Sequence, residues 1–263
     1  MIDAPPGNDS VPGWVPEWPL PPNVMAWATE RGPGDDGFGG FNLGLHVGDD
    51  PTRVMAHRER LQRHCGGLPI QWLTQVHGTR VHRLEASTRP EWGGAQAPQA
   101  DALYSDRPGS ALAIMTADCL PVLLCDDQGR EIAAVHAGWR GLAAGILHDV
   151  VAAFRARPEQ LSAWLGAAIC ARHFEVGQEV YRAFVDSPAF REQSGSVRAA
   201  FSPAQRAGHY DCDLYALARA CLRDCGLARI YGGTCCTWHQ PERFYSYRRE
   251  GVCGRMATVI ALR

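Results

Sequence analysis

Three short segments carry side chains that could bind a metal ion where a predicted strand ends. They are residues 75–78 (QVHG), 116–121 (TADCLP) and 135–141 (VHAGWRG), each punctuated by glycine or proline. Each supplies one imidazole or thiol: His77, Cys119 and His136. Two imidazoles and one thiolate would leave a coordination position open on a zinc ion, as in a catalytic site. That ion keeps a residual positive charge, which can lower the pKa of bound water or hold a substrate oxygen.

The spacing alone does not separate a shared metal site from three packed core side chains, because the candidate ligands lie far apart in the chain. A shared site is favoured because functional groups gather at strand ends and loops. Asp118, beside the thiol, either caps a turn or orients a ligand or accepts a substrate proton. Arg140 stands where a helix is predicted to begin; it forms a surface ion pair or binds an anionic reactant such as phosphate.

The elements that would position these segments change type along the chain. Short apolar segments indicate strands at 70–76, 81–84, 102–105, 111–116, 121–125 and 132–136, and a later one at 161–169. Apolar periodicity predicts helices over 51–64, from just after the 137–139 turn to Phe154, over 177–185 and over 211–225. Most strand connections are too short for a helical crossover, which favours antiparallel pairing. We therefore predict an α+β fold of mixed, largely antiparallel β-sheets surrounded by helices.

The domain organisation is predicted to be simple. Residues 1–22 are rich in proline and would form an extended arm that either wraps the body or frays. Residues 23–263 show no linker and are expected to form a single catalytic domain. Within it, residues 31–40 (RGPGDDGFGG) have the composition of a mobile loop.

Composition excludes several function classes. The formal net charge is −2 over 263 residues, so neither nucleic acid nor an anionic membrane is an expected partner. All 26 basic residues are arginine, which excludes a P-loop and a lysine Schiff base. The chain has ten cysteines but no C-x-x-C pair, which argues against zinc fingers, zinc ribbons and thioredoxin-like sites. With neither a signal peptide nor a long apolar segment in the sequence, we expect a cytoplasmic protein with reduced thiols.

The sequence resembles the YfiH family of laccase-domain or polyphenol oxidase proteins, which is associated with purine nucleoside phosphorylase activity and also carries the label of peptidoglycan editing factor. The resemblance runs from about residue 15 to residue 262. It rests on the three segments above together with residues 42–44 (NLG), 174–177 (FEVG), 246–249 (SYRR) and 254–256 (GRM). Two departures from the family pattern, at 32–35 (GPGD) and at His57, bear on substrate preference more than on the metal.

The resemblance implies Zn²⁺ held by His77, Cys119 and His136. It also implies phosphorolysis of adenosine, inosine and methylthioadenosine to a free base and ribose 1-phosphate, with some adenosine deamination. Purine nucleosides and phosphate would be the partners of a monomer or weak homodimer. We expect catalytic roles for Cys119, Asp118 and Arg140, and substrate contacts from Arg31, Asn42, Phe174 and Arg248, with Phe174 as a surface on which a purine stacks.

Three other functions compete with this interpretation. A copper polyphenol oxidase would need many imidazoles, usually as His-x-His pairs, and none of the ten histidines lies two residues from another. A cysteine hydrolase or amidase that edits peptidoglycan precursors would use Cys119 as nucleophile, His136 as base, and Asp118 or another group to orient the base. A non-enzymatic scaffold would not need an open ligand set.

The remaining histidines and cysteines have simpler expected roles. We expect His173 and His239 to face solvent or to form hydrogen bonds, and not to bind a metal. Cys235 and Cys236 are expected to pack in a strand, with a vicinal disulfide as the alternative.

Overall fold

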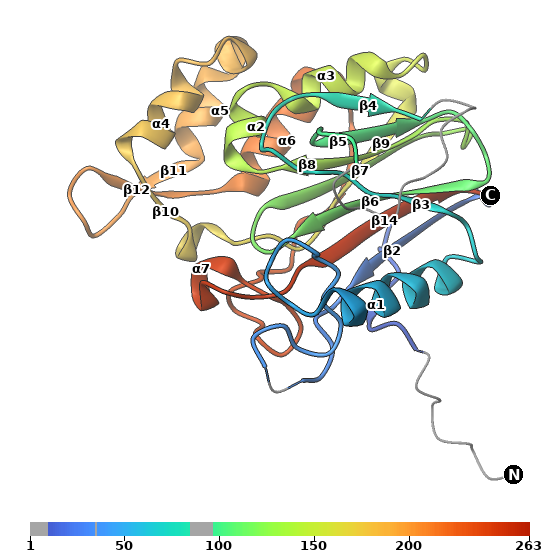
Figure 1. The fold of residues 1–263 in the computed structure, drawn as a ribbon. Coiled ribbons are helices and arrows are strands. Elements are labelled where there is room, and N and C mark those ends of the chain that lie inside the picture. Colours follow the sequence, from blue (N-terminus) through green and yellow to red (C-terminus); the bar gives the residue numbers. More distant parts are fainter. Residues whose placement is uncertain (1–9, 35, 85–96) are drawn as a thin grey trace, which may run out of the picture.

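Two β-sheets packed face to face, with helices on their outer surfaces, form the body of the protein (Figure 1). The computed structural model describes residues 10–34, 36–84 and 97–263. The first sheet has the order β1 (Gly13–Trp14), β2 (Val24–Thr29), β14 (Met256–Leu262), β6 (Ser110–Thr116), β3 (Ile70–Gln71). The second has the order β13 (Arg229–Gly232), β9 (Leu161–Leu165), β7 (Leu120–Asp126), β8 (Ile132–Ala137), β5 (Ala102–Ser105), β4 (Val81–Arg83).

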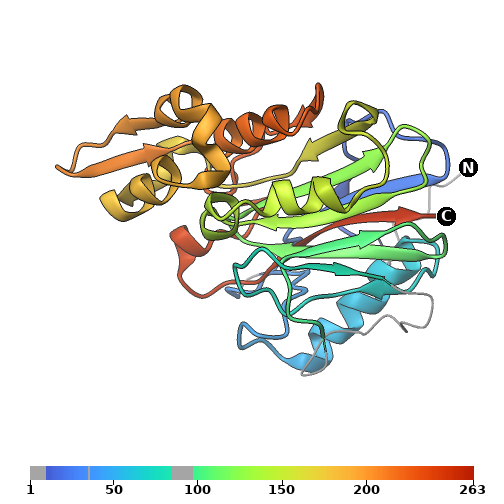
Figure 2. The same ribbon diagram turned by 90° about the horizontal axis from the view of Figure 1, so that it is seen from above.

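A third, small sheet lies to one side of this sandwich with two helices against it (Figure 2). Its strands have the order β10 (Glu175–Gly177), β12 (His209–Cys212), β11 (Phe201–Pro203). Across the three sheets only the pairs β3–β6, β4–β5 and β9–β13 are parallel among the described residues. The predicted class of mixed, largely antiparallel sheets surrounded by helices is therefore confirmed.

Alternation along the central strands divides the core into layers. In β7, Val122 and Leu124 pack against the helices that cover the six-stranded sheet, whereas Leu123 and Cys125 lie between the two sheets. The covering helices are α2 (Trp139–Ala143), α3 (Ile146–Ala153) and α6 (Leu214–Asp224). Because successive side chains of a strand point to opposite faces, the near-continuous apolar sequence of β7 suits a strand buried on both sides.

The other face of the five-stranded sheet is covered by α1 (Pro51–His64). The helix begins after Asp50, whose side chain accepts a hydrogen bond from the Thr52 backbone N–H at 2.8 Å, and it has proline at its first position. Val54 and Leu61 are fully buried. In the described part of the chain, the remaining helices are α4 (Gln178–Val185), α5 (Ser194–Ala199), α7 (Tyr247–Glu250) and three 3₁₀ turns, Pro158–Gln160, Ala171–His173 and Pro188–Gln193.

Several predicted elements differ from the structure at their ends. The helix predicted to run on to Phe154 is two helices, because Gly145 adopts a left-handed φ of 96° between α2 and α3. The predicted helix 211–225 begins at Leu214, since Asp213 caps it and the two residues before that belong to β12. The predicted strands 70–76 and 161–169 end early, at Gln71 and Leu165.

Of the predicted N-terminal arm, residues 10–22 pack on the body, and residues 1–9 lie outside the described part. Trp14 belongs to β1, which pairs with β2, and the buried Trp18 indole donates a hydrogen bond to Ser162 Oγ at 3.0 Å. Throughout the described residues, no helix combines the length and apolar character needed to cross a lipid bilayer.

Candidate metal centre

The structure brings His77, Cys119 and His136 together. Their candidate ligand atoms all lie within 4.8 Å of one another. Cys119 Sγ is 4.0 Å from His77 Nε2, and the two imidazole rings have centroids 4.7 Å apart with their planes at 78°. His136 is buried, Cys119 is half-buried and His77 is exposed, so the group runs from the protein interior to the surface.

The connections that carry two of these residues have unusual backbone geometry. Cys119 lies on the short link by which the chain passes from β6 in one sheet to β7 in the other. Asp118, just before it, has φ 96°, and His77, in the loop between β3 and β4, has φ 60°. These are the two non-glycine residues with positive φ in the described part of the chain, and such strained positions cluster at functional sites.

Asp118 holds its own conformation through its carboxylate. Oδ1 accepts a hydrogen bond from Thr237 Oγ1 at 2.6 Å and Oδ2 accepts one from the Arg248 backbone N–H at 2.7 Å. The side chain is also largely buried. Both oxygens therefore have protein partners, which join the Cys119 segment to the loop that carries Thr237 and to α7 (Tyr247–Glu250).

Asp101, a residue that the sequence analysis did not single out, organises the imidazoles. Its buried carboxylate accepts hydrogen bonds from His136 Nδ1 at 2.8 Å and from the backbone N–H groups of Val76, His77 and Gly78. With a proton on Nδ1, His136 presents Nε2 as its free ligand atom. In the sequence, Asp101 is visible only as a carboxylate directly before the apolar strand 102–105. That position alone does not indicate a role, because the groups that Asp101 contacts lie far from it in the chain.

Gly138 leaves the space that these three side chains share. A Cβ at this position would lie 3.1 Å from Cys119 Sγ, 3.1 Å from His77 Cδ2 and 3.5 Å from His136 Cε1. Any larger residue would press on the candidate ligands from behind. The site therefore fits a divalent ion bound by two imidazoles and one thiolate. Gly138 leaves room beside the ligands, and Asp101 holds the His136 ring through a hydrogen bond.

The cluster also favours the ionised thiol. Desolvation raises the pKa of the Cys119 thiol, but attraction to His136 and hydrogen bonds with both imidazoles outweigh it and bring the pKa to about 6. Desolvation lowers the pKa of His136, whereas Cys119 and Asp101 raise it, and the result is about 9. Burial raises the pKa of Asp101, but its hydrogen bonds with His136 and the backbone keep it below its usual value. The protein without metal thus holds a thiolate–imidazolium pair supported by a carboxylate.

A cavity of about 660 Å³ opens in front of the cluster. His77, Cys119 and His136 lie in its lining, which also includes Arg58, Arg255, His46, Gln75, Met115 and Tyr247. The Arg58 guanidinium stacks over the Trp72 ring at 4.0 Å and donates to the Leu43 carbonyl oxygen, and burial lowers its pKa to about 10. Arg58 and Arg255 therefore place positive charge in the cavity that the candidate ligands face.

Other residues expected at the site lie elsewhere. Arg140, Phe174 and Arg248 line a second cavity of about 560 Å³, to which Arg206 and His209 also contribute. Phe174 is buried, and the Arg248 guanidinium lies 5.3 Å from its ring centroid. The predicted anion and stacking groups are thus gathered together, but in a different cavity from the three candidate ligands.

Arg31 and Asn42 are engaged with protein partners. The Arg31 guanidinium forms an ion pair with Glu250 at 2.9 Å and lies over the Tyr245 ring. Asn42 is fully buried; its Nδ2 donates to Asp49 Oδ2 at 2.8 Å and its Oδ1 accepts from the Arg255 backbone N–H at 2.8 Å. These two residues support the segments that border the first cavity and do not line it.

The two departures from the family pattern lie outside the cavities as well. His57 is buried, with Nδ1 2.9 Å from the Asn42 carbonyl oxygen. In the 32–35 segment, residue 35 is outside the described residues, and the three before it are absent from the linings of both cavities.

The chain is similar in sequence to known proteins over nearly its whole length. Residues 25–263 match the family described as multi-copper polyphenol oxidoreductase laccase. Purine nucleoside phosphorylase YfiH of Escherichia coli is 44% identical, with 94% of this chain and 98% of that protein covered. A purine nucleoside phosphorylase of Pseudomonas aeruginosa is 43% identical, with 95% and 98% covered.

Solved structures show the same fold. The crystal structure of a Neisseria meningitidis protein assigned to DUF152 has a TM-score of 0.86 at 43% identity, covering 95% of this chain and 98% of that one. YlmD from Geobacillus stearothermophilus has a TM-score of 0.83 at 29% identity, with 92% and 93% covered. The resemblance predicted from the sequence motifs is confirmed, and the chain belongs to the multi-copper polyphenol oxidoreductase laccase family, together with the YfiH proteins.

Proposed function

We propose that this protein is a zinc-dependent purine nucleoside phosphorylase that converts adenosine, inosine and methylthioadenosine to the free base and ribose 1-phosphate, with adenosine deamination as a side activity. The observation that carries the proposal is the cluster of two imidazoles and one thiol on the wall of a cavity that also contains two arginines. Its full-length relatives are named purine nucleoside phosphorylases.

His77, Cys119 and His136 would hold the ion through His77 Nε2, Cys119 Sγ and His136 Nε2. When bound, zinc supplies a concentrated positive charge and leaves a coordination position free for an oxygen of substrate or water. Asp101 keeps the His136 ring oriented and its Nδ1 protonated. The His77 cluster has two imidazoles, fewer than a trinuclear copper site needs, which favours zinc over multicopper chemistry.

The remaining groups of the first cavity divide between phosphate and nucleoside. Arg58 and Arg255 are suited to an anion, because guanidinium groups stay charged and donate several hydrogen bonds. Tyr247 is 59% exposed and lines the same cavity, with the Arg255 guanidinium 5.9 Å from its ring centroid. Its exposed ring is therefore better placed than that of the buried Phe174 to stack on a purine. Phosphate and nucleoside bound in one cavity would meet the reaction's need for close, oriented reactants.

Base release from inosine, followed with and without phosphate, tests the proposal. The zinc-loaded protein should release hypoxanthine only when phosphate is present, and ribose 1-phosphate should form in equal amount. Hypoxanthine release at the same rate without phosphate would reject phosphorolysis. His77→Ala is the matched control, since it removes a candidate ligand from the exposed end of the cluster.

A cysteine hydrolase remains the second candidate, and one specific observation favours it. Asp101, His136 and Cys119 form a carboxylate–imidazole–thiol series, in which Asp101 takes the orienting role expected of Asp118 or another group. In such an enzyme the metal-free protein would cleave an amide of a cell-wall peptide, and zinc would inhibit it by binding the thiolate. In the phosphorylase, the metal-free protein is inactive and zinc restores turnover of inosine.

A further inference from the structure

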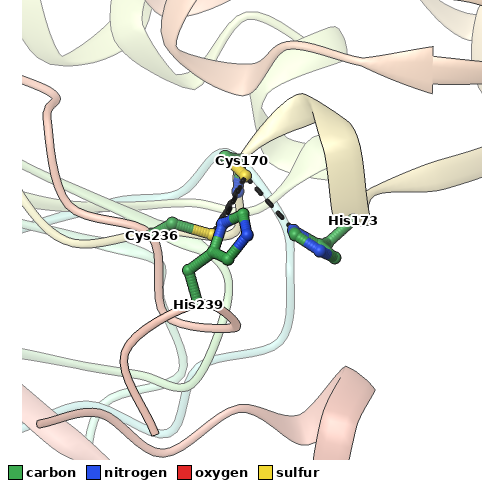
Figure 3. A group of neighbouring side chains, drawn as sticks. All are labelled: Cys170, His173, Cys236 and His239. Atoms are coloured by element: carbon green, nitrogen blue, oxygen red, sulfur yellow. Dashed lines mark hydrogen bonds between the residues drawn. The ribbon is translucent and has the colours of Figure 1, made fainter.

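We propose that the protein holds a second zinc ion, structural in role, at Cys170, His173, Cys236 and His239. The four side chains converge although they come from two distant segments, 170–173 (CARH) and 236–239 (CTWH) (Figure 3). Each segment is a C-x-x-H pair. The proposal does not depend on the nucleoside chemistry, because no member of this group belongs to the His77 cluster or lines the first cavity.

The separations of the donor atoms suit a tetrahedral ion. All four candidate ligand atoms lie within 4.8 Å of one another. Cys170 Sγ is 3.0 Å from Cys236 Sγ, 3.4 Å from His173 Nδ1 and 3.9 Å from His239 Nδ1. Zinc bonds of about 2.3 Å to sulfur and about 2.0 Å to nitrogen place tetrahedral ligands roughly 3.3–3.8 Å apart. Small side-chain adjustments would therefore complete the coordination.

The charges also balance. On binding Zn²⁺ the two thiols would lose two protons, and two thiolates with two neutral imidazoles make the loaded site neutral. A neutral site is compatible with the buried position of Cys236, while the exposed His239 gives the ion a route from solvent. Four protein ligands leave no open position, which distinguishes this group from the three-ligand cluster and assigns it a structural role.

Neighbouring backbone and side-chain groups hold the proposed ligands in place. The Cys170 backbone N–H donates to Cys236 Sγ at 3.3 Å, an interaction that favours a thiolate. The His173 ring stacks on Trp238, with centroids 3.9 Å apart and planes at 11°. A parallel bridge between Ala168 and Cys236 joins the two segments, at the ligand Cys236 in one and two residues before Cys170 in the other. The backbone thus already holds the two C-x-x-H pairs side by side.

The two segments also meet the residue that positions Cys119. Thr237, between two of the proposed ligands, donates its hydroxyl to Asp118 Oδ1 at 2.6 Å. The backbone N–H of Ile169, next to Cys170, donates to the Asp118 carbonyl oxygen at 3.0 Å. An ion at the second site would fasten both segments and so stiffen the support of the first cluster from outside the cavity.

Zinc stoichiometry of the purified full-length chain tests the proposal. After loading with excess zinc and gel filtration, the wild-type chain should hold two ions. His239→Ala and Cys236→Ser should each hold one ion, in the His77 cluster. Zinc should raise the thermal unfolding midpoint of these two variants by less than it raises that of the wild type. Cys235→Ser, an adjacent thiol outside the group, should still hold two.

Cobalt binding to a His77→Ala variant gives an independent signal. With the first cluster disabled, Co²⁺ should still produce the intense visible bands of a tetrahedral site and thiolate charge-transfer absorption, both abolished by adding Cys236→Ser. Because His239 is exposed, its replacement by alanine should leave the fold intact, so a one-ion result for that variant has a local cause. One ion per wild-type chain, lost in His77→Ala and unchanged in His239→Ala, would overturn the proposal, as would a Cys170–Cys236 disulfide in the freshly purified protein.

Discussion

Replacing Asp101 by asparagine should loosen the metal centre without removing a ligand. Oδ1 accepts from the His77 backbone N–H at 2.9 Å and from His136 Nδ1 at 2.8 Å, and Oδ2 accepts from the N–H groups of Val76 and Gly78 at 3.1 and 2.7 Å. In one orientation, the NH₂ group of an asparagine faces the backbone N–H groups of Val76 and Gly78, which then have no acceptor there. In the other orientation it faces the His77 N–H and His136 Nδ1, and it favours the His136 tautomer that carries its proton on Nε2, the proposed ligand atom. A donor left without an acceptor costs about 1–3 kcal/mol when it is buried. Because the three backbone N–H groups are only partly buried, the free energy of unfolding should fall by about 2 kcal/mol, near the lower end for two such donors.

Zinc affinity should fall by about 10- to 100-fold in the same variant. The substitution weakens the hydrogen bonds that orient the His136 imidazole and that hold the loop carrying His77. Competition with a chromophoric chelator measures that affinity, and thermal unfolding of the metal-free protein measures the stability. Asp126→Asn is the matched control: Asp126 is also buried and accepts from the backbone N–H groups of Arg130 and Glu131, but it lies at the far end of β7 from Cys119. Equal zinc affinity in the two variants would refute the positioning role of Asp101.

Three further predictions concern the same cluster. His77→Ala should lose both bound zinc and phosphorolysis of inosine, as measured by metal analysis and base release; retention of both would remove His77 from the ligand set. Gly138→Ala should weaken zinc binding, because its Cβ would press on Cys119 Sγ and His77, whereas Gly195→Ala, with open space at that Cβ, should bind zinc like the wild type. In metal-free protein, alkylation of Cys119 by iodoacetamide, followed on its peptide by mass spectrometry, should accelerate as the pH rises through about 6, where the depressed pKa puts thiolate formation, and zinc should protect the thiol. Acceleration centred near pH 9 would contradict the proposed pairing with His136.

The elements that local sequence determines were the ones predicted best. The predicted bounds of α1 agree with the structure because Asp50 caps it, Pro51 begins it and its apolar spacing is local. The break at Gly145 is not predicted, because a periodic apolar pattern continues across it and the left-handed φ of Gly145 is seen only in the structure. Local patterns predict the existence of an element, whereas its ends depend on neighbours in space.

The candidate site shows the same division. His77, Cys119 and His136 were predicted from ligand type and from turn residues at strand ends, and the structure brings them together; their role as ligands stays a proposal. Asp101 could not be predicted in this way, because the pairing of β5 with β8 places it beside His136, whose backbone N–H donates to the Asp101 carbonyl oxygen at 2.7 Å. The sequence also cannot predict which residues line the same cavity. Arg58 and Arg255 line the first cavity, whereas Arg140 lines the second.

The two C-x-x-H pairs lie far apart in the sequence. The absence of C-x-x-C argued against zinc fingers and ribbons, but a Cys₂His₂ site can use one thiol and one imidazole from each segment. Neither pair is informative alone, and the sequence predicts that His173 and His239 face solvent or form hydrogen bonds. The parallel bridge at Ala168 and Cys236 supplies the missing information that the two segments are neighbours.

Anomalous diffraction at the zinc edge, from crystals of zinc-loaded protein, would locate the ion of the His77 cluster. We expect a peak at bonding distance, about 2.0–2.3 Å, from His77 Nε2, Cys119 Sγ and His136 Nε2, on the wall of the cavity that contains Arg58 and Arg255. No peak at these atoms, in crystals grown from protein that releases hypoxanthine from inosine in a phosphate-dependent reaction, would contradict this expectation.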